Sequence, residues 1–205
     1  MQRQLICIIL ILIPSLVLGQ NATVIKRNVG KSVQTKVLKF DMHLSVIFSK
    51  DYQTNFNREY LAQRFTPDSL TIDLVESKLE EQFVKAYKRY LEAEWKTFEQ
   101  NKESYDWKHL VKNKGQREKS LIEAARKEQK KLDEIHRQYL GLINNKGEKI
   151  ILIQLVDLRN DEYELKNSLE KEWIVGFGDW FEENTSSFEY VIDRDKLYFF
   201  GWTER

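Results

Sequence analysis

The chain has 205 residues, of which 33 are basic, 32 are acidic and only one is a cysteine. A single cysteine excludes an intramolecular disulfide framework. The small net charge hides an asymmetry, because residues 157–205 carry 13 acidic against six basic side chains. The compensating positive charge is spread along segments that are also rich in acidic residues. This favours solvated helix faces over a nucleic-acid-binding surface.

The first nineteen residues are the most distinctive segment. Arg3 precedes an apolar run, Leu5 to Leu18, and the segment closes on Val17-Leu18-Gly19. This pattern predicts a secretory signal peptide, residues 1–19, that is cleaved before Gln20 and removes Cys7 with it. The run is shorter than the roughly 18–20 residues that a membrane span needs. We therefore expect an exported protein, periplasmic or secreted, with no membrane span in the mature chain.

Residues 20–205 suit one domain of ordinary size. Residues 20–34 are polar and are expected to form a loose lead-in. Val37 to Ser49 combines β-branched and aromatic residues in partial alternation, which predicts one or two strands. Asp51 to Arg64 is polar, and its period is ambiguous.

Two helices are predicted next. Thr66-Pro67-Asp68 offers an N-cap candidate, a proline suited to a first turn and an acid near the positive end of the helix dipole. Apolar residues then recur at steps of three and four from Ile72 to Phe98, which indicates a helix of about seven turns. A second, more polar helix is expected from about Gly115 to Arg137, with a thin apolar edge.

After Arg137 the pattern changes to that of strands. Tyr139–Ile143 and Lys149–Val156 flank the turn sequence Asn144-Asn145-Lys146-Gly147, which predicts a β-hairpin. Asp161–Lys171 is interpreted as a short polar helix or a long loop. Three further strands are predicted at Trp173–Phe177, Phe188–Ile192 and Leu197–Trp202.

Together these elements predict a single α+β domain. We expect an antiparallel sheet of four to six strands, arranged as a meander of hairpins. One long amphipathic helix and a second polar helix should pack on one of its faces.

Two segments carry a resemblance to a known group of proteins. They are RFTPDSLTIDLVESKL, residues 64–79, and RQYLGLINNKGEKIILI, residues 137–153, in that order behind a signal peptide. The chain resembles a group of small exported proteins from Bacteroidota-type bacteria. The resemblance implies export and a helix-before-sheet order. It transfers no catalytic or binding residue to this sequence.

Aromatic residues gather near the C-terminus, with ten of them between positions 173 and 202. In the last predicted strand, alternate residues give both faces apolar side chains, so both faces are covered or one of them is exposed. An exposed face could bind a peptide, a glycan or another protein. The candidate binding residues are Trp173, Trp180, Tyr198, Phe200 and Trp202. The competing interpretation is that helices cover one face and Trp202 anchors the C-terminus.

The polar residues suggest little chemistry. His43, His109 and His136 lack metal-ligand spacing, although Asp133 and His136 would share a helix face. We expect no metal, no cofactor and no catalytic residue. The acidic residues that follow the strands are interpreted mainly as solvated loops, with carboxylate catalysis left open at Asp157, Asp161, Asp179 and Glu182.

The sequence thus favours a non-enzymatic binding or accessory protein of the bacterial envelope or secreted fraction. Its partner would be an unidentified protein, peptide or glycan. One alternative is a carboxylate-dependent hydrolase of cell-wall or extracellular polymer. Another is a structural subunit of an assembly.

Overall fold

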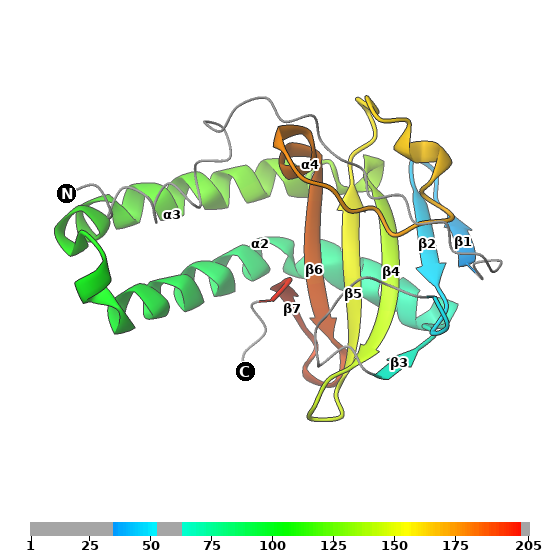
Figure 1. Ribbon diagram of the computed structural model, residues 1–205, viewed down its shortest axis with the longest axis horizontal. Helices are drawn as coiled ribbons and strands as arrows, with labels where there is room; N and C mark the ends of the chain where they lie inside the picture. The colour runs from blue at the N-terminus through cyan, green and yellow to red at the C-terminus, as the bar shows by residue number, and fades with distance from the viewer. Residues whose placement is uncertain (1–34, 53–62, 202–205) are drawn as a thin grey trace.

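The computed structural model describes residues 35–52 and 63–201, and it confirms the α+β class (Figure 1). A seven-stranded, mostly antiparallel sheet carries one long helix on a face, and a second helix runs back along the first. The predicted leader, the lead-in and Trp202 lie outside the described residues. Within the described residues, no helix is long and apolar enough to cross a membrane.

The sheet has more strands than expected, and one pair is parallel. Its order is β1-β2-β4-β5-β6-β7, and β3 also pairs with β4. The strands are β1 (Thr35–Lys39), β2 (Leu44–Phe48), β3 (Gln63–Phe65), β4 (His136–Ile143), β5 (Lys149–Val156), β6 (Thr185–Val191) and β7 (Lys196–Phe199). Six strands form the continuous order, at the upper end of the expected range, and the ambiguous segment before the long helix supplies β3 as a seventh. The pairing of β2 with β4 is parallel because a helical crossover returns the chain to β4 in the direction of β2.

Helix α2 (Ser69–Gln100) confirms the predicted long helix. The Asp68 carboxylate accepts a hydrogen bond from the Thr71 backbone N–H at 2.7 Å, which satisfies one of the free donors of the first turn. The apolar stripe from Ile72 to Ala86 is fully buried against one face of the sheet, where it meets Tyr139, Phe188 and their neighbours.

Helix α3 (Trp107–Gln129) begins and ends about eight residues before the predicted bounds. The carboxylate of Asp106 accepts a hydrogen bond from the His109 backbone N–H at 3.2 Å and starts the helix there. Gly115, which suggested a boundary, lies inside the helix with open space around it. After a 3₁₀ turn at Leu132–Glu134 the chain enters β4, so Asp133 and His136 do not share a helix face.

The opposite face of the sheet is covered by the connection between β5 and β6, which includes the short helix α4 (Asp179–Asn184). Trp173–Phe177 is not a strand, contrary to the prediction. The Gln138 side chain instead hydrogen-bonds backbone groups of this connection. It accepts from the Ile174 N–H at 2.8 Å and donates to the Leu169 and Glu172 carbonyls. The Asp161–Lys171 segment contains a single 3₁₀ turn, Leu165–Asn167.

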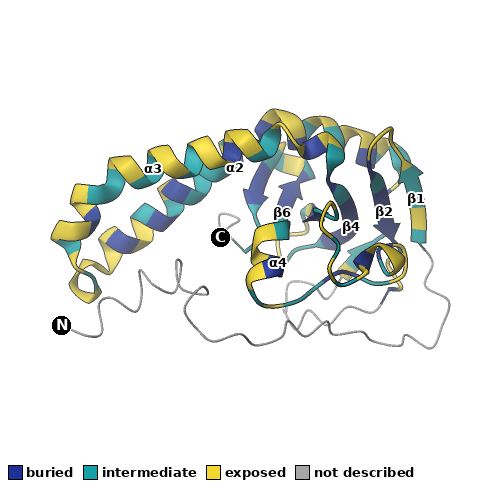
Figure 2. Cartoon of the chain, turned by 90° about the horizontal axis from the view of Figure 1, so that it is seen from above, coloured by how far each residue is buried: buried dark blue, intermediate teal, exposed yellow. Residues whose placement is uncertain are grey.

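The remaining predictions for the sheet are confirmed. The β4–β5 hairpin closes at the expected turn, where Gly147 has a φ of 78°. The segment predicted at Val37–Ser49 contains β2 and overlaps β1, and the segments predicted at Phe188–Ile192 and Leu197–Trp202 overlap β6 and β7, which ends at Phe199. Figure 2 shows the main consequence of the topology: α2 and α3 extend together well beyond the sheet.

Candidate functional site

Among the described residues, the part of α2 beyond Tyr90 packs on α3 and on the turn that joins the two helices. Tyr90 contacts Phe199 of β7, with ring centroids 5.3 Å apart, at the edge of the sheet. Farther along α2, Leu91 and Phe98 are buried, and both face residues of α3. We call this projecting part of α2, from Tyr90 onward, together with α3 the helical hairpin.

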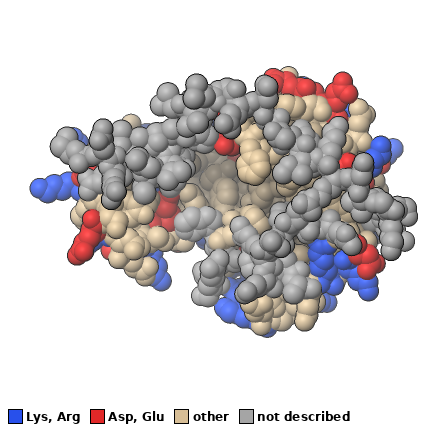
Figure 3. All heavy atoms as spheres, viewed as in Figure 1, with Lys and Arg blue, Asp and Glu red and all other residues tan. Residues whose placement is uncertain are grey.

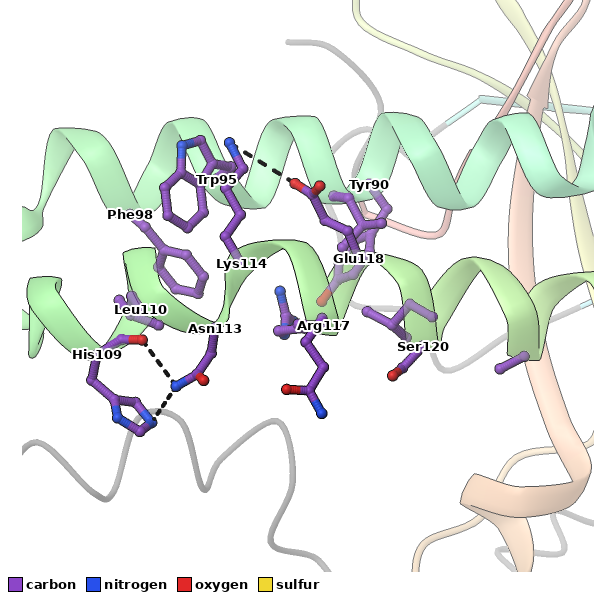
Figure 4. Close-up of a pocket in the computed structure, with 14 residues that line it drawn as sticks. Tyr90, Trp95, Phe98, His109, Leu110, Asn113, Lys114, Arg117, Glu118 and Ser120 are labelled. Carbon is purple, nitrogen blue, oxygen red and sulfur yellow. Dashed lines mark hydrogen bonds and ion pairs between the residues drawn. The ribbon is translucent and has the colours of Figure 1, made fainter.

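A hollow of about 630 Å³ lies between the two helices of the hairpin (Figure 4). We call it the α2–α3 groove. Its wall is mostly apolar, and its apolar residues are Leu91, Trp95, Phe98, Leu110, Leu121 and Ala124. The polar lining residues are Tyr90, His109, Asn113, Lys114, Gln116, Arg117, Glu118 and Ser120. A volume of this size is typical of small-molecule sites, which often lie between helices.

The sequence explains why the groove is open. On α2, large side chains such as Trp95 and Phe98 continue the apolar stripe past the edge of the sheet. Opposite them, α3 presents Ser120 and Ala124, which are too small to fill the space. Only Leu110 and Ala125 of α3 are buried. Within the described part of the chain, no third layer covers these two helices, so part of their apolar surface faces the groove.

A buried ion pair joins the two helices beside the groove. Glu94 is only 2% exposed, and its carboxylate accepts two hydrogen bonds from the Arg117 guanidinium, one of them 2.8 Å long. The Tyr90 hydroxyl donates to the same carboxylate at 2.9 Å. Burial and the Glu94 charge raise the pKa of Tyr90 to about 12. The Arg117 charge is thus neutralised within the protein, and the pair holds the hairpin together.

Lys114 also lines the groove, but unlike Arg117 it is not held by a buried carboxylate. Its ammonium is 4.0 Å from the centroid of the Trp95 ring and 3.9 Å from a carboxylate oxygen of Glu118 (Figure 4). Both charged side chains are more than one-third exposed. Trp95 is also 5.3 Å from the ring of Trp107 at the start of α3. The mouth of the groove is therefore aromatic and carries one accessible cation.

The aromatic residues proposed from the sequence lie in the body of the protein. Trp173, Trp180 and Tyr198 are no more than 8% exposed and belong to the core on the side of the sheet opposite α2. The indole N–H of Trp180 donates to the Asn160 carbonyl at 2.8 Å and fastens the covering connection. Phe200 is half-buried against the same core. Trp202 lies outside the described residues.

Part of this aromatic set borders a second, smaller hollow of about 200 Å³. Trp173 and Phe200 line it together with Gln154 and Ser187 of the sheet. The Ser187 hydroxyl and the Gln154 amide oxygen are hydrogen-bonded to each other. Figure 3 views the molecule from this side, where the described surface near the centre is mostly tan and thus carries few Lys, Arg, Asp or Glu side chains. Because Ser187 and Gln154 bind each other, the smaller hollow is a weaker candidate for ligand binding than the α2–α3 groove.

The four candidate catalytic carboxylates do not converge on either hollow. Arg159 holds the pKa of Asp157 below its usual value, and Asp161 accepts hydrogen bonds from the backbone of Leu165 and Lys166. Asp179 and Glu182 are exposed at the start of α4, where burial and the charge of Asp179 raise the pKa of Glu182. Ion pairing, backbone capping and solvation account for these positions.

A buried polar cluster beneath α2 was not anticipated. Ser45 and Tyr139 donate to the Glu76 carboxylate at 2.6 and 2.7 Å, and the Arg137 guanidinium lies 3.2 Å from it. Burial opposes the charged form, but hydrogen bonds from His43, Ser45 and Tyr139 and the charge of Arg137 lower the pKa of Glu76 overall. None of these residues lines either hollow, so the cluster joins α2 to the sheet.

The histidines have structural partners. His43 Nδ1 faces the Asp133 carbonyl at 3.0 Å, and His136 Nδ1 accepts from the Leu44 N–H at 3.0 Å. His109 is exposed and lies 3.0 Å from the Asn113 amide. Among the described residues, no group of three or more histidine, cysteine or acidic side chains is placed to hold a metal ion.

No protein-family model, curated protein or solved structure matches the chain. The α2–α3 groove is therefore the feature from which we infer a function. The sequence held a partial signal for it, because the apolar stripe of α2 is far longer than the apolar edge of α3.

Proposed function

We propose that the protein is an exported, non-enzymatic binding protein that holds an apolar ligand in the α2–α3 groove. The observation that carries the proposal is the groove itself, a hollow of about 630 Å³ with a largely apolar wall. Burial of apolar surface is the main favourable contribution to binding in such a site. Export is supported by the apolar leader before Gln20.

The location of the groove supports a binding role. The body of the protein buries rings and aliphatic side chains on both faces of its sheet, whereas the helical hairpin extends beyond it. An exposed apolar groove on a projecting element adds little to the core that stabilises the body. Apolar surface that is not needed for folding is typical of interaction sites.

The groove can be tested by filling it. Ala124 lines the groove and is exposed, so Ala124→Trp should occupy the hollow without disturbing the core. Lys119→Trp is the matched control, because Lys119 is an exposed residue of α3 that does not line the groove. The probe is N-phenyl-1-naphthylamine, a neutral apolar dye that fluoresces when it leaves water.

We expect saturable dye binding by the native protein and by Lys119→Trp. Ala124→Trp should weaken binding by about tenfold or more, equivalent to about 1.4 kcal/mol. Circular dichroism spectra should show that both variants keep their helices. Equal dye binding by all three proteins would rule out the groove as the site.

Export is tested separately by mass spectrometry of the protein recovered from an exporting bacterial host. The expected chain begins at Gln20. A chain that still contains residues 1–19 outside the cytoplasm, or one that stays inside the cell, would contradict this part of the proposal.

A further inference from the structure

The charge at the mouth of the groove indicates what kind of apolar ligand it would accept. Two basic side chains of α3, Lys114 and Arg117, line the groove. Arg117 is already engaged by the buried carboxylate of Glu94 through two hydrogen bonds. Lys114 is therefore the cation that remains to meet a ligand.

The surroundings of Lys114 leave its hydrogen-bonding capacity largely unused within the described part of the chain. Its ammonium stacks on Trp95, which contributes no acceptor atom. The nearest carboxylate oxygen, on Glu118, is 3.9 Å away, beyond the 2.7–3.2 Å of a normal N–H···O hydrogen bond. Exposed lysine–glutamate pairs of this kind are weak, so an incoming anion can replace Glu118 at little cost.

We propose that the ligand is a single-chain amphiphile with one anionic head group. Its tail would lie in the α2–α3 groove and its head would accept hydrogen bonds from Lys114. This inference rests on the proposed function and adds the chemical class of the ligand to it. Apolar contacts alone do not fix the direction in which a chain lies in the groove. A charge-assisted hydrogen bond at the mouth would fix that direction.

The position of Lys114 fits this role in two further ways. Its aliphatic stem starts from α3 and reaches toward Trp95 on α2, so it lies over apolar surface while its charged end stays near water (Figure 4). The face of Trp95 stabilises the ammonium without neutralising it. The cation is thus held in place at the mouth before any ligand binds.

The test uses displacement of N-phenyl-1-naphthylamine by three twelve-carbon amphiphiles: dodecanoate, 1-dodecanol and dodecyltrimethylammonium, each below its aggregation threshold. We expect dodecanoate to displace the dye at about tenfold lower concentration than the other two, equivalent to one charge-assisted hydrogen bond. Lys114→Gln should remove that advantage. Lys112→Gln, which changes an exposed lysine of α3 outside the groove, should keep it.

The possible failures are distinguishable. If all three amphiphiles displace the dye equally well from the native protein, the anionic head is wrong and the apolar groove still stands. If Lys114→Gln retains the preference for dodecanoate, Lys114 does not bind the head group and this inference is wrong, while the apolar groove still stands. If the native protein binds the dye but none of the three displaces it, this inference is wrong; if the native protein binds no dye, the proposed function is wrong as well.

Discussion

The sheet and the helical hairpin differ in how completely they bury their apolar side chains. The sheet is covered on one face by α2 and on the other by the β5–β6 connection, and both of its cores contain fully buried side chains. The hairpin has two layers, and its helix α3 buries only Leu110 and Ala125. The comparison shows that one continuous apolar stripe on α2 serves two purposes: its first half seals a core, and its second half leaves a groove.

The largest expected effect comes from truncating a ring in each half of α2. Phe83 is fully buried between the helix and the sheet, so Phe83→Ala should reduce the free energy of unfolding by about 3–5 kcal/mol. Phe98→Ala, in the wall of the groove, should cost about half as much, because the site is already open on one side. Urea denaturation measures both. Equal losses would mean that the hairpin is packed as tightly as the body.

The ion pair between the helices gives the next largest effect. Arg117→Met leaves the Glu94 carboxylate buried without its partner and should cost about 2–3 kcal/mol, since Arg117 itself is partly exposed. The double variant Glu94→Gln with Arg117→Met should recover most of that loss, because no charge then remains buried. Failure of the second change to restore stability would show that the pair contributes through direct attraction.

In the sheet, His136 should make the free energy of unfolding depend on pH. Burial, with smaller contributions from the charges of Lys166 and His43, lowers the pKa of His136, whose Nδ1 accepts the Leu44 N–H. As the pH falls below about 6.5, the unfolded chain therefore takes up a proton before the folded protein does, and stability decreases. His136→Gln should flatten the stability profile between pH 7.5 and 5. Urea denaturation at each pH measures the profile, and a loss of stability as steep in His136→Gln as in the native protein would contradict this prediction.

The last comparison uses glycine-to-alanine substitutions in the two regions, and the smallest effect is expected for Gly115→Ala. The two substitutions should change the stability of the protein in opposite directions. Gly115→Ala in α3 meets no atom within 4 Å and should stabilise the protein by about 0.4–1 kcal/mol. Gly141→Ala in β4 would place its new carbon 2.4 Å from the Phe65 carbonyl oxygen, so it should destabilise the sheet. Thermal unfolding of the two variants compares a loosely packed helix with a tightly packed strand.

The elements that were predictable are those with strong local patterns. The stripe of α2 and the turn between β4 and β5 are encoded by residues close together in the chain, although the N-cap is Asp68 and not Thr66. The start of α3 was missed because Gly115 suggested a boundary, whereas the deciding interaction is the cap at Asp106. Trp173–Phe177 does not form a strand because its backbone is hydrogen-bonded by Gln138, which lies 35 residues before Trp173. No local sequence pattern predicts that contact.

The candidate site was harder to predict for the same reason. The aromatic residues near the C-terminus were a reasonable hypothesis for a binding surface. Of the five candidates, Trp173, Trp180, Tyr198 and Phe200 instead pack in the core on the second face of the sheet, a role that depends on where the β5–β6 connection folds. The groove arises from the pairing of large side chains on α2 with small ones on α3. That pairing appears only once the alignment of the two helices is known.

The most direct test of the comparison is a methyl NMR titration with N-phenyl-1-naphthylamine. Leu91, Leu110 and Leu121 report on the groove, and the buried Leu140 and Leu152 report on the body. We predict saturable chemical-shift changes for the methyl groups of the three groove leucines and none for those of the two core leucines. Shifts confined to the core leucines, or no saturable shift at any groove leucine, would contradict the assignment of the α2–α3 groove as the binding site.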